Sequence, residues 1–279
     1  MQKVKLKAKW KKLIIDLILI TFIVLFIVSF YHLINYKINE KKMNNQIDII
    51  KNNVTIDETK QDSSVEIIKQ NEEINETNPY WDYIKMNLIN VNFNNLKTIN
   101  NDVKGWIQVN GTNINYPFVQ TKNNTYYLDH SFDKKYNSAG WLFLDYRNDL
   151  SNLNDKNTII YGHSMINKTM FGTLRDILTT KWQSNPDNYI VKLSTEHENT
   201  LWQVFSIYHI PTTNDYIKTD FKYNQEFKIF AEKLKERSVF DFHTDIQETD
   251  RILTLSTCYK KVERIVLHAK LIKREIKEN

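Results

Sequence analysis

The pattern of hydrophobic and polar positions separates an amino-terminal apolar run from the rest of the chain. Residues 17–34 are almost entirely apolar and contain no ionised side chain, and six lysines without an acidic residue stand in residues 1–12. About twenty helical residues cover the roughly 30 Å hydrocarbon layer of a bilayer, so we expect a transmembrane anchor over residues 13–36. Lysines on the amino side predict a cytoplasmic basic tail over 1–12 and an extracellular location for everything after the anchor.

A cleaved signal peptide is the alternative interpretation of this run. Its apolar core would be shorter and would end at a small-x-small cleavage site, whereas Tyr31, His32 and Tyr36 follow here. The uncleaved anchor is therefore favoured. Residues 37–78 are polar and charged and lack aromatic side chains, which is typical of a solvated extracellular stalk.

Alternating apolar positions and aromatic residues return at Pro79 and predict one folded domain over residues 79–279. Turn residues separate eight segments with the alternation of β-strands. These segments are Gly105–Val109, Tyr116–Val119, Gly140–Leu144, Thr158–Tyr161, Tyr189–Leu193, Leu201–His209, Arg251–Thr257 and Arg264–Ile272. Helices are expected over Trp81–Ile99, Met170–Leu178 and Asn224–Ser238. Many short strands with few helices indicate a mainly β fold, a closed or nearly closed barrel.

Composition narrows the function classes. The chain has 38 basic and 33 acidic residues, a net charge of +5 that does not suggest a nucleic-acid-binding protein. A single cysteine excludes an internal disulfide and a cysteine zinc cluster. No carboxylate cluster suggests a calcium site and no glycine-rich loop suggests phosphate binding, so neither a metal nor a cofactor is expected.

The single cysteine, Cys258, ends the predicted strand RILTLSTC and shares a face with Thr254 and Ser256. A free cysteine is either buried and inert or exposed and reactive, and a strand end beside a loop is a place where reactive groups are presented. If a hairpin follows, Arg264 opens the next strand opposite Cys258 and points the same way. A guanidinium there would lower the thiol pKa and offer donors to an oxyanion, unless it only caps the hairpin at the surface.

A cysteine nucleophile needs a proton-transfer partner, and three histidines are candidates. His163 in NTIIYGHSM follows a predicted strand and a glycine, again at a strand end beside a loop. His268 lies on the strand of Arg264, but four extended residues from it, or about 13 Å. His130 in YYLDHSF is the third candidate.

These residues together resemble a sortase, most closely one of class B. TLSTC (Thr254–Cys258) is similar to the family's TLxTC signature, NTIIYGHSM carries the family histidine, and Arg264 matches the family arginine. The stretch Gly105–Phe132 also resembles the early strands of class B enzymes. The resemblance covers about residues 95–272 and implies an eight-stranded sortase-type barrel with added helices, following the anchor and stalk.

The resemblance also implies a membrane-anchored cysteine transpeptidase. Cys258 would attack a carbonyl in the carboxy-terminal sorting signal of a secreted protein and form a thioester, which an amine of a peptidoglycan precursor would resolve. His163 would act as general acid and then general base, and Arg264 would stabilise the oxyanion. Its partners would be the sorting peptide, the peptidoglycan amine and, through one helix, the membrane, but no nucleic acid. Tethering would raise the effective concentration of both substrates.

Substrate-contact residues carry over from the resemblance as Ser256, Thr212, Tyr216, Ile217 and Leu128, although Tyr216, Ile217 and Leu128 suit ordinary barrel packing equally well. The connection from Cys258 to Arg264 is shorter than in the class B pattern and carries Lys260-Lys261 where an acidic residue often stands. No acidic residue that would orient His163 can therefore be identified.

Three other functions remain open from the sequence. A hydrolytic enzyme of the same barrel shares the acylation step and differs only in using water to resolve the thioester. A pilin-linking sortase usually has a second hydrophobic anchor near its carboxy terminus, whereas residues 273–279 read KREIKEN. A non-catalytic surface binding module would leave Cys258 inert.

Overall fold

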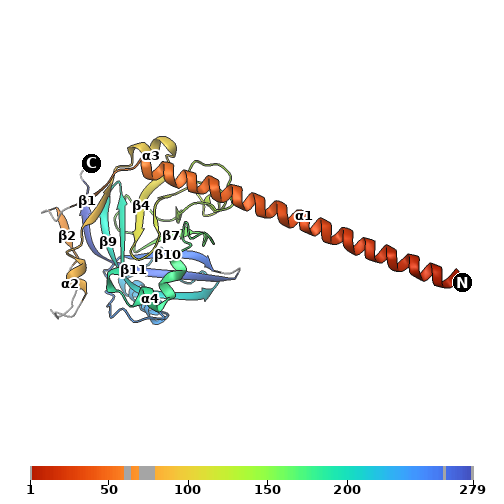
Figure 1. The fold of residues 1–279 in the computed structure, drawn as a ribbon. Coiled ribbons are helices and arrows are strands. Elements are labelled where there is room, and N and C mark those ends of the chain that lie inside the picture. The colour runs from red at the N-terminus through yellow and green to blue at the C-terminus, as the bar shows by residue number, and fades with distance from the viewer. Residues whose placement is uncertain (1, 60–63, 69–78, 260–261, 278–279) are drawn as a thin grey trace. The chain divides into compact units, whose positions relative to one another are not determined.

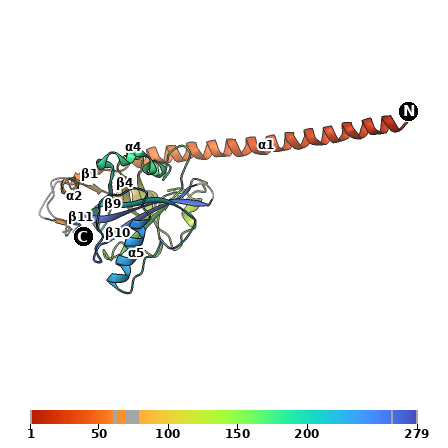
Figure 2. The same ribbon diagram turned by 90° about the horizontal axis from the view of Figure 1, so that it is seen from below.

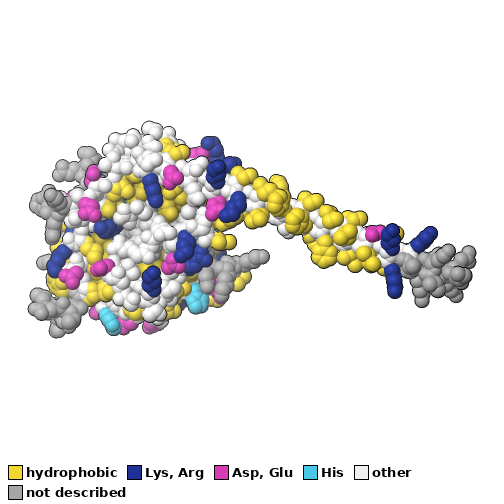
Figure 3. All heavy atoms as spheres, in the orientation of Figure 1, with side chains coloured by type: hydrophobic (Ala, Val, Ile, Leu, Met, Phe, Trp, Pro, Cys, Tyr) yellow, Lys and Arg dark blue, Asp and Glu magenta, His cyan; other side chains and the backbone are white. Residues whose placement is uncertain are grey.

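The computed structural model describes residues 2–59, 64–68, 79–259 and 262–277, with side chains described for 9–59, 64–68, 79–257 and 262–277. The chain divides into two units, residues 1–45 and 46–279. Helix α1 (Gln2–Asn52) makes up the first unit and continues into the second. It is long and apolar enough to cross a membrane, and none of its most apolar stretch is buried. Figure 3 shows its hydrophobic side chains as an extended apolar surface, as expected of a membrane span.

The second unit is built on a closed barrel of eight strands (Figure 1). The strands are β4 (Val103–Val109), β5 (Asn115–Val119), β6 (Phe143–Leu144), β7 (Asn157–Gly162), β8 (Ile190–Thr195), β9 (Glu198–Pro211), β10 (Ile252–Tyr259) and β11 (Glu263–Ile276). Their order around the barrel is β10-β7-β6-β5-β4-β8-β9-β11, and pairing of β10 with β11 closes it. The predicted eight-stranded barrel is confirmed, and each predicted strand overlaps one of these.

Helix α5 (Asn224–Glu236) covers one face of the sheet (Figure 2). Its apolar side, with Phe227 and Leu234, packs in a cluster that also contains Phe205 of β9 and Val266 of β11. The face of β11 that carries Val266 and His268 is therefore buried beneath α5. Short helical turns connect other strands, namely η1 (Tyr126–Leu128), η2 (Leu174–Leu178), α4 (Thr180–Gln183) and η3 (Pro186–Asn188).

The predicted helix over Trp81–Ile99 is wrong in its middle. Two short helices, α2 (Tyr80–Tyr83) and α3 (Asn94–Ile99), flank a strand, β3 (Leu88–Val91). Buried Lys273 donates hydrogen bonds to the carbonyls of Ile84 and Met86, at 2.9 and 3.0 Å, where helix α2 has just ended. The residues of β3 pair with strand β1 (Ile56–Thr59), about thirty residues earlier in the chain. This long-range pairing outweighs the local helical periodicity.

The helix expected over Met170–Leu178 is also shorter than predicted. Met170 has a positive φ of 51° and forms an isolated bridge with Ser164, so a helix cannot begin there. Only residues Leu174–Leu178 are helical, as η2. The helix predicted over Asn224–Ser238 is confirmed as α5.

Two segments of the predicted stalk belong to the folded unit. Strand β1 (Ile56–Thr59) pairs with β3, and strand β2 (Val65–Ile67) extends the sheet beyond β11. Their few apolar residues are sufficient because each strand adds to an existing edge and needs no core of its own. A solvated stalk therefore does not describe these segments.

Candidate active site

The ends of three adjacent strands meet at one place on the barrel. Strand β10 lies between β11, which is antiparallel to it, and β7, which is parallel to it. The predicted pairing of Cys258 with Arg264 across the β10–β11 hairpin is confirmed. On the other side Thr257 pairs with Gly162, so Cys258 and His163 each follow the last pair of the parallel register. The Cys258 backbone thus stands between the strand ends carrying Arg264 and His163, while its side chain lies outside the described part of the chain.

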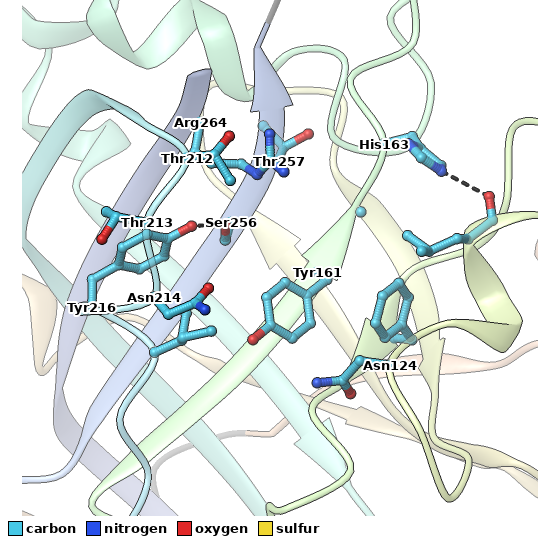
Figure 4. Close-up of a pocket in the computed structure, with 14 residues that line it drawn as sticks. Asn124, Tyr161, His163, Thr212, Thr213, Asn214, Tyr216, Ser256, Thr257 and Arg264 are labelled. Carbon is cyan, nitrogen blue, oxygen red and sulfur yellow. Dashed lines mark hydrogen bonds between the residues drawn. The ribbon is translucent and has the colours of Figure 1, made fainter. Parts of the chain in front are cut away.

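A pocket opens at this end of the barrel (Figure 4). The predicted catalytic residues His163 and Arg264 line it, together with all five predicted substrate-contact residues, which are Leu128, Thr212, Tyr216, Ile217 and Ser256. The remaining lining residues are Asn124, Phe143, Tyr161, Gly162, Thr213, Asn214 and Thr257. Residues spread over more than a hundred positions of sequence therefore form one concave site, the arrangement expected for binding a ligand.

The imidazole of His163 is oriented by a backbone carbonyl. Its Nε2 lies 2.7 Å from the carbonyl oxygen of Leu128, at the end of η1 (Figure 4). A carbonyl only accepts, so Nε2 carries the hydrogen, and in the neutral ring Nδ1 is the nitrogen with an acceptor lone pair. The same carbonyl stabilises the imidazolium form. Leu128 therefore supplies the orienting group that the sequence did not reveal.

Arg264 is half-buried on the opposite side of the pocket from His163, beside Thr212 and Thr257 (Figure 4). Its Nη1 donates to the carbonyl of Glu263 at 3.0 Å, which restricts the guanidinium. A guanidinium presents several N–H donors in a planar fork that keeps its charge at all physiological pH values. Placed beside a nucleophile, such a group stabilises an oxyanion as it develops.

The loop between β9 and α5 forms one wall of the pocket. At its start, the backbone N and Oγ1 of Thr212 both donate to the carbonyl of Val262, at 2.8 and 3.1 Å. Further along, the hydroxyl of Tyr216 lies 2.8 Å from Oγ of Ser256 on β10. These hydrogen bonds attach the loop to the β10–β11 hairpin at two points.

Ordinary core packing, the alternative role for Tyr216, Ile217 and Leu128, explains these three residues to different extents. Tyr216 belongs to the buried cluster under α5, and Ile217 packs against that cluster, although both also reach the pocket. Leu128 is 41% exposed, so its side chain is not needed for the core. Core packing therefore accounts for Tyr216 and Ile217 but not for Leu128.

His268, the first rival to His163, is fully buried and does not line the pocket. The Thr254 hydroxyl donates to Oδ1 of Asn157 at 2.7 Å and so accepts from Nδ1 of His268 at 2.9 Å. Nε2 of His268 accepts from the Tyr208 hydroxyl at 2.8 Å. Burial, assisted by the charge of Arg237, lowers the pKa of His268 to about 3. A ring that is neutral and enclosed in this way is a structural core residue.

His130, the second rival, also lies outside the residues lining the pocket. Its Nδ1 lies 2.7 Å from the carboxylate of Asp129 and 2.8 Å from the carbonyl of Tyr126. Its ring stacks on that of Tyr126, with 4.1 Å between centroids. These contacts stabilise the η1 turn. Of the three candidate histidines, His163 is therefore the one that lines the pocket.

The buried state of His268 predicts a pH-dependent stability. In the unfolded chain this histidine takes up a proton near its ordinary pKa of about 6.5, whereas in the folded chain its pKa is about 3. Between these values the unfolded state binds more protons, so the free energy of unfolding contributed by His268 falls as pH falls from about 6.5 toward 3. Denaturant unfolding should show wild type losing about 2 kcal/mol more than His268→Gln between pH 7 and pH 5. Equal losses in both proteins would contradict this assignment.

Several pocket residues were not singled out from the sequence. Tyr161 could have been predicted as a pocket residue, because it lies two residues before His163, next to the strand end that presents this histidine. Asn124 could not have been predicted, because it lies in the long connection between β5 and β6, which nothing in the sequence places beside His163. Within the described residues, no group of three or more His, Cys, Asp or Glu side chains is placed to hold a metal ion.

Comparison with known proteins gives consistent matches. The sortase domain family matches residues 107–272. Sortase B of Staphylococcus aureus is 39% identical over 185 residues, covering 65% of this chain and 75% of the relative. A solved Staphylococcus aureus sortase B–substrate complex is 38% identical with a TM-score of 0.61, covering 65% of this chain and 84% of the other. A solved sortase B complexed with triglycine has the same identity and TM-score, covering 65% of this chain and 85% of the other.

Proposed function

Because this chain belongs to the sortase family of cysteine transpeptidases, we propose that it cleaves the sorting signal of secreted proteins through a thioester on Cys258 and joins them to a peptidoglycan amine. One observation carries the proposal. The register of three neighbouring strands places Cys258 between the ends that carry His163 and Arg264. A nucleophile, a proton carrier and an oxyanion donor are the minimum set for acyl transfer.

In the acylation half, the Cys258 thiolate attacks the scissile carbonyl carbon and forms a C–S bond. The carbonyl oxygen becomes an oxyanion that the Arg264 guanidinium stabilises by charge and hydrogen bonding. When the C–N bond breaks, His163 donates a proton to the departing amine, and a thioester remains on Cys258. The Leu128 carbonyl keeps the ring oriented throughout, because its hydrogen bond to Nε2 is available in both protonation states.

In the second half, a primary amine attacks the thioester carbonyl and His163 accepts a proton from it. The C–S bond breaks as the new amide forms, which returns Cys258 as thiolate. A sortase B relative has been solved with triglycine, a peptide whose free amino terminus is a suitable acceptor. We take the acceptor here to be a similar unhindered amine on a peptidoglycan precursor.

The sorting peptide is assigned to the pocket lined by Leu128, Thr212, Tyr216, Ile217 and Ser256. A Staphylococcus aureus sortase B has been solved as a substrate complex, which supports a peptide ligand for this family member as well. The wall mixes apolar side chains with hydroxyl groups, and such surfaces bind extended peptides by combining burial with directed hydrogen bonds.

The apolar part of α1 is proposed to be an uncleaved single-pass anchor. The lysines of residues 1–12 support an orientation with the amino terminus in the cytoplasm and the catalytic domain outside. Anchoring confines the enzyme to the membrane surface where secreted proteins emerge, so the effective concentration of both substrates rises.

Turnover in the presence and absence of triglycine tests the proposal against its alternatives. Full-length protein in detergent micelles is incubated with a mixed library of sorting-type pentapeptides, and products are identified by mass spectrometry. We expect a ligated product, an amino-terminal peptide fragment joined to triglycine, to exceed the hydrolysed fragment at millimolar triglycine. Hydrolysed fragment alone would identify a hydrolytic enzyme. No peptide cleavage, with or without triglycine, would favour a non-catalytic binding module.

A further inference from the structure

A buried carboxylate lies at the centre of a hydrogen-bond network behind the pocket. Asp145, just after β6, is fully buried. Its Oδ2 accepts from the Tyr161 hydroxyl at 2.9 Å and from Nδ2 of Asn124 at 3.0 Å. Both donors line the pocket, whereas Asp145 does not. One carboxylate therefore connects two pocket walls, strand β7 and the β5–β6 connection.

Arg147 forms a bidentate salt bridge with this carboxylate. Its Nε donates to Oδ1 of Asp145 at 2.8 Å and its Nη2 to Oδ2 at 2.7 Å. Burial alone would raise the pKa of Asp145, but hydrogen bonds from Arg147 and Tyr161 outweigh burial and lower it. The carboxylate is thus ionised, and the pairing compensates for its removal from water.

Arg147 also reaches the third wall of the pocket. Its Nη2 donates to the backbone carbonyl of Ile217 at 2.9 Å, in the loop between β9 and α5. The next carbonyl of this loop, that of Lys218, accepts from Nδ2 of buried Asn157 at 2.9 Å. Two successive carbonyls of a pocket-forming loop are therefore held by side chains from the β6–β7 connection and from the start of β7. Arg147 itself is not among the residues lining the pocket.

We infer that the Asp145–Arg147 pair is a positioning device for the peptide site, and that Arg147 sets the affinity for the sorting peptide without contacting it. The pair joins Asn124, Tyr161 and the Ile217 carbonyl, which come from three separate segments, into one rigid wall. Loops otherwise sample several conformations, and ordering them on binding costs affinity. This inference rests on the proposed function, since it takes the pocket to be the peptide site.

Lysine at position 147 would keep the charge but not the function. A lysine has one ammonium group in place of the planar fork, so it cannot hold both carboxylate oxygens and the Ile217 carbonyl in the same geometry. The loop would then lose one of its fixed points, while the groups at the strand ends beside Cys258 would be unaffected. Peptide binding should weaken and the chemical step should not.

The test compares full-length wild type with Arg147→Lys for kcat, KM and the rate of Cys258 alkylation by iodoacetamide. We expect KM for the cleaved peptide to rise about tenfold, with kcat and the alkylation rate within about twofold of wild type. Arg274→Lys is the matched control, because Nε of Arg274 donates to the carboxylate of Glu66 of β2 and Arg274 does not line the pocket. It should leave KM unchanged.

Other results would overturn the inference. Unchanged KM in Arg147→Lys, or equal losses in kcat and alkylation rate, would show that the pair does not act through peptide binding. If wild type cleaves no peptide, the proposed function fails together with this inference, which separates that case from an active wild type with an insensitive variant. Should Arg147→Lys unfold at the assay temperature, the paired variant Asp145→Asn with Arg147→Gln removes both charges together, and the same rise in KM is expected.

Discussion

Full-length protein carrying Cys258→Ala is expected to lose sorting-peptide cleavage by at least about 10⁴-fold, because the substitution removes the chain's single thiol, the proposed nucleophile. His163→Ala should fall by a comparable factor, since the leaving amine would depart without a proton. Peptide cleavage followed by chromatography measures both losses. His268→Gln serves as the control for His163, because His268 is enclosed in the core by Tyr208 and Thr254.

The outcome for the two histidines is decisive. Near-normal cleavage by His163→Ala, with loss in a folded His268→Gln protein, would transfer the proton-transfer role to a fully buried residue that does not line the pocket, and would contradict the site geometry. Thermal unfolding of each variant establishes that a loss of activity is not a loss of fold. Retained cleavage by Cys258→Ala would remove the basis for a covalent mechanism.

The second large effect is expected at Arg264. Arg264→Ala should lower kcat by about 10²–10³-fold, close to 3–4 kcal/mol, because the oxyanion would form without its charged donor. Arg264→Lys should recover part of this loss, since an ammonium supplies charge without the planar fork. Steady-state kinetics of peptide cleavage separates an effect on kcat from one on KM.

Arg274→Ala is the matched control for Arg264. Both arginines lie on β11, but Arg274 bonds to Glu66 at the far end of the strand and is absent from the pocket lining. Its removal should leave kcat unaltered. An Arg264→Ala protein that keeps wild-type kcat would refute the oxyanion role, whatever its KM.

The barrel could be predicted because the sequence pattern of each strand is visible within a few consecutive residues. Each of the eight strands shows its own alternation or a short apolar run between turn residues, and the hairpin from Cys258 to Arg264 follows from one short connection. This hairpin was enough to pair the nucleophile with the arginine. The parallel pairing that brings His163 to the same place joins segments about a hundred residues apart, so the spacing alone left three histidines open.

What could not be predicted depends on contacts between distant segments. Strand β3 forms because it pairs with β1, about thirty residues earlier, and its own sequence is compatible with a helix. The group that orients His163 is a backbone carbonyl, which any residue at position 128 would offer, so a search for an acidic side chain could not find it. Arg147 and Asp145 likewise look like turn residues until the fold brings the Ile217 carbonyl to the guanidinium.

The most direct test is the intact mass of full-length protein quenched with acid during turnover of a cleaved peptide. We expect a species heavier than the free enzyme by the acyl fragment, located on Cys258 by fragmentation, released by hydroxylamine and absent from Cys258→Ala. Turnover at the wild-type rate with the acyl group on another residue, or with no acyl enzyme even when the acceptor amine is withheld, would contradict this expectation.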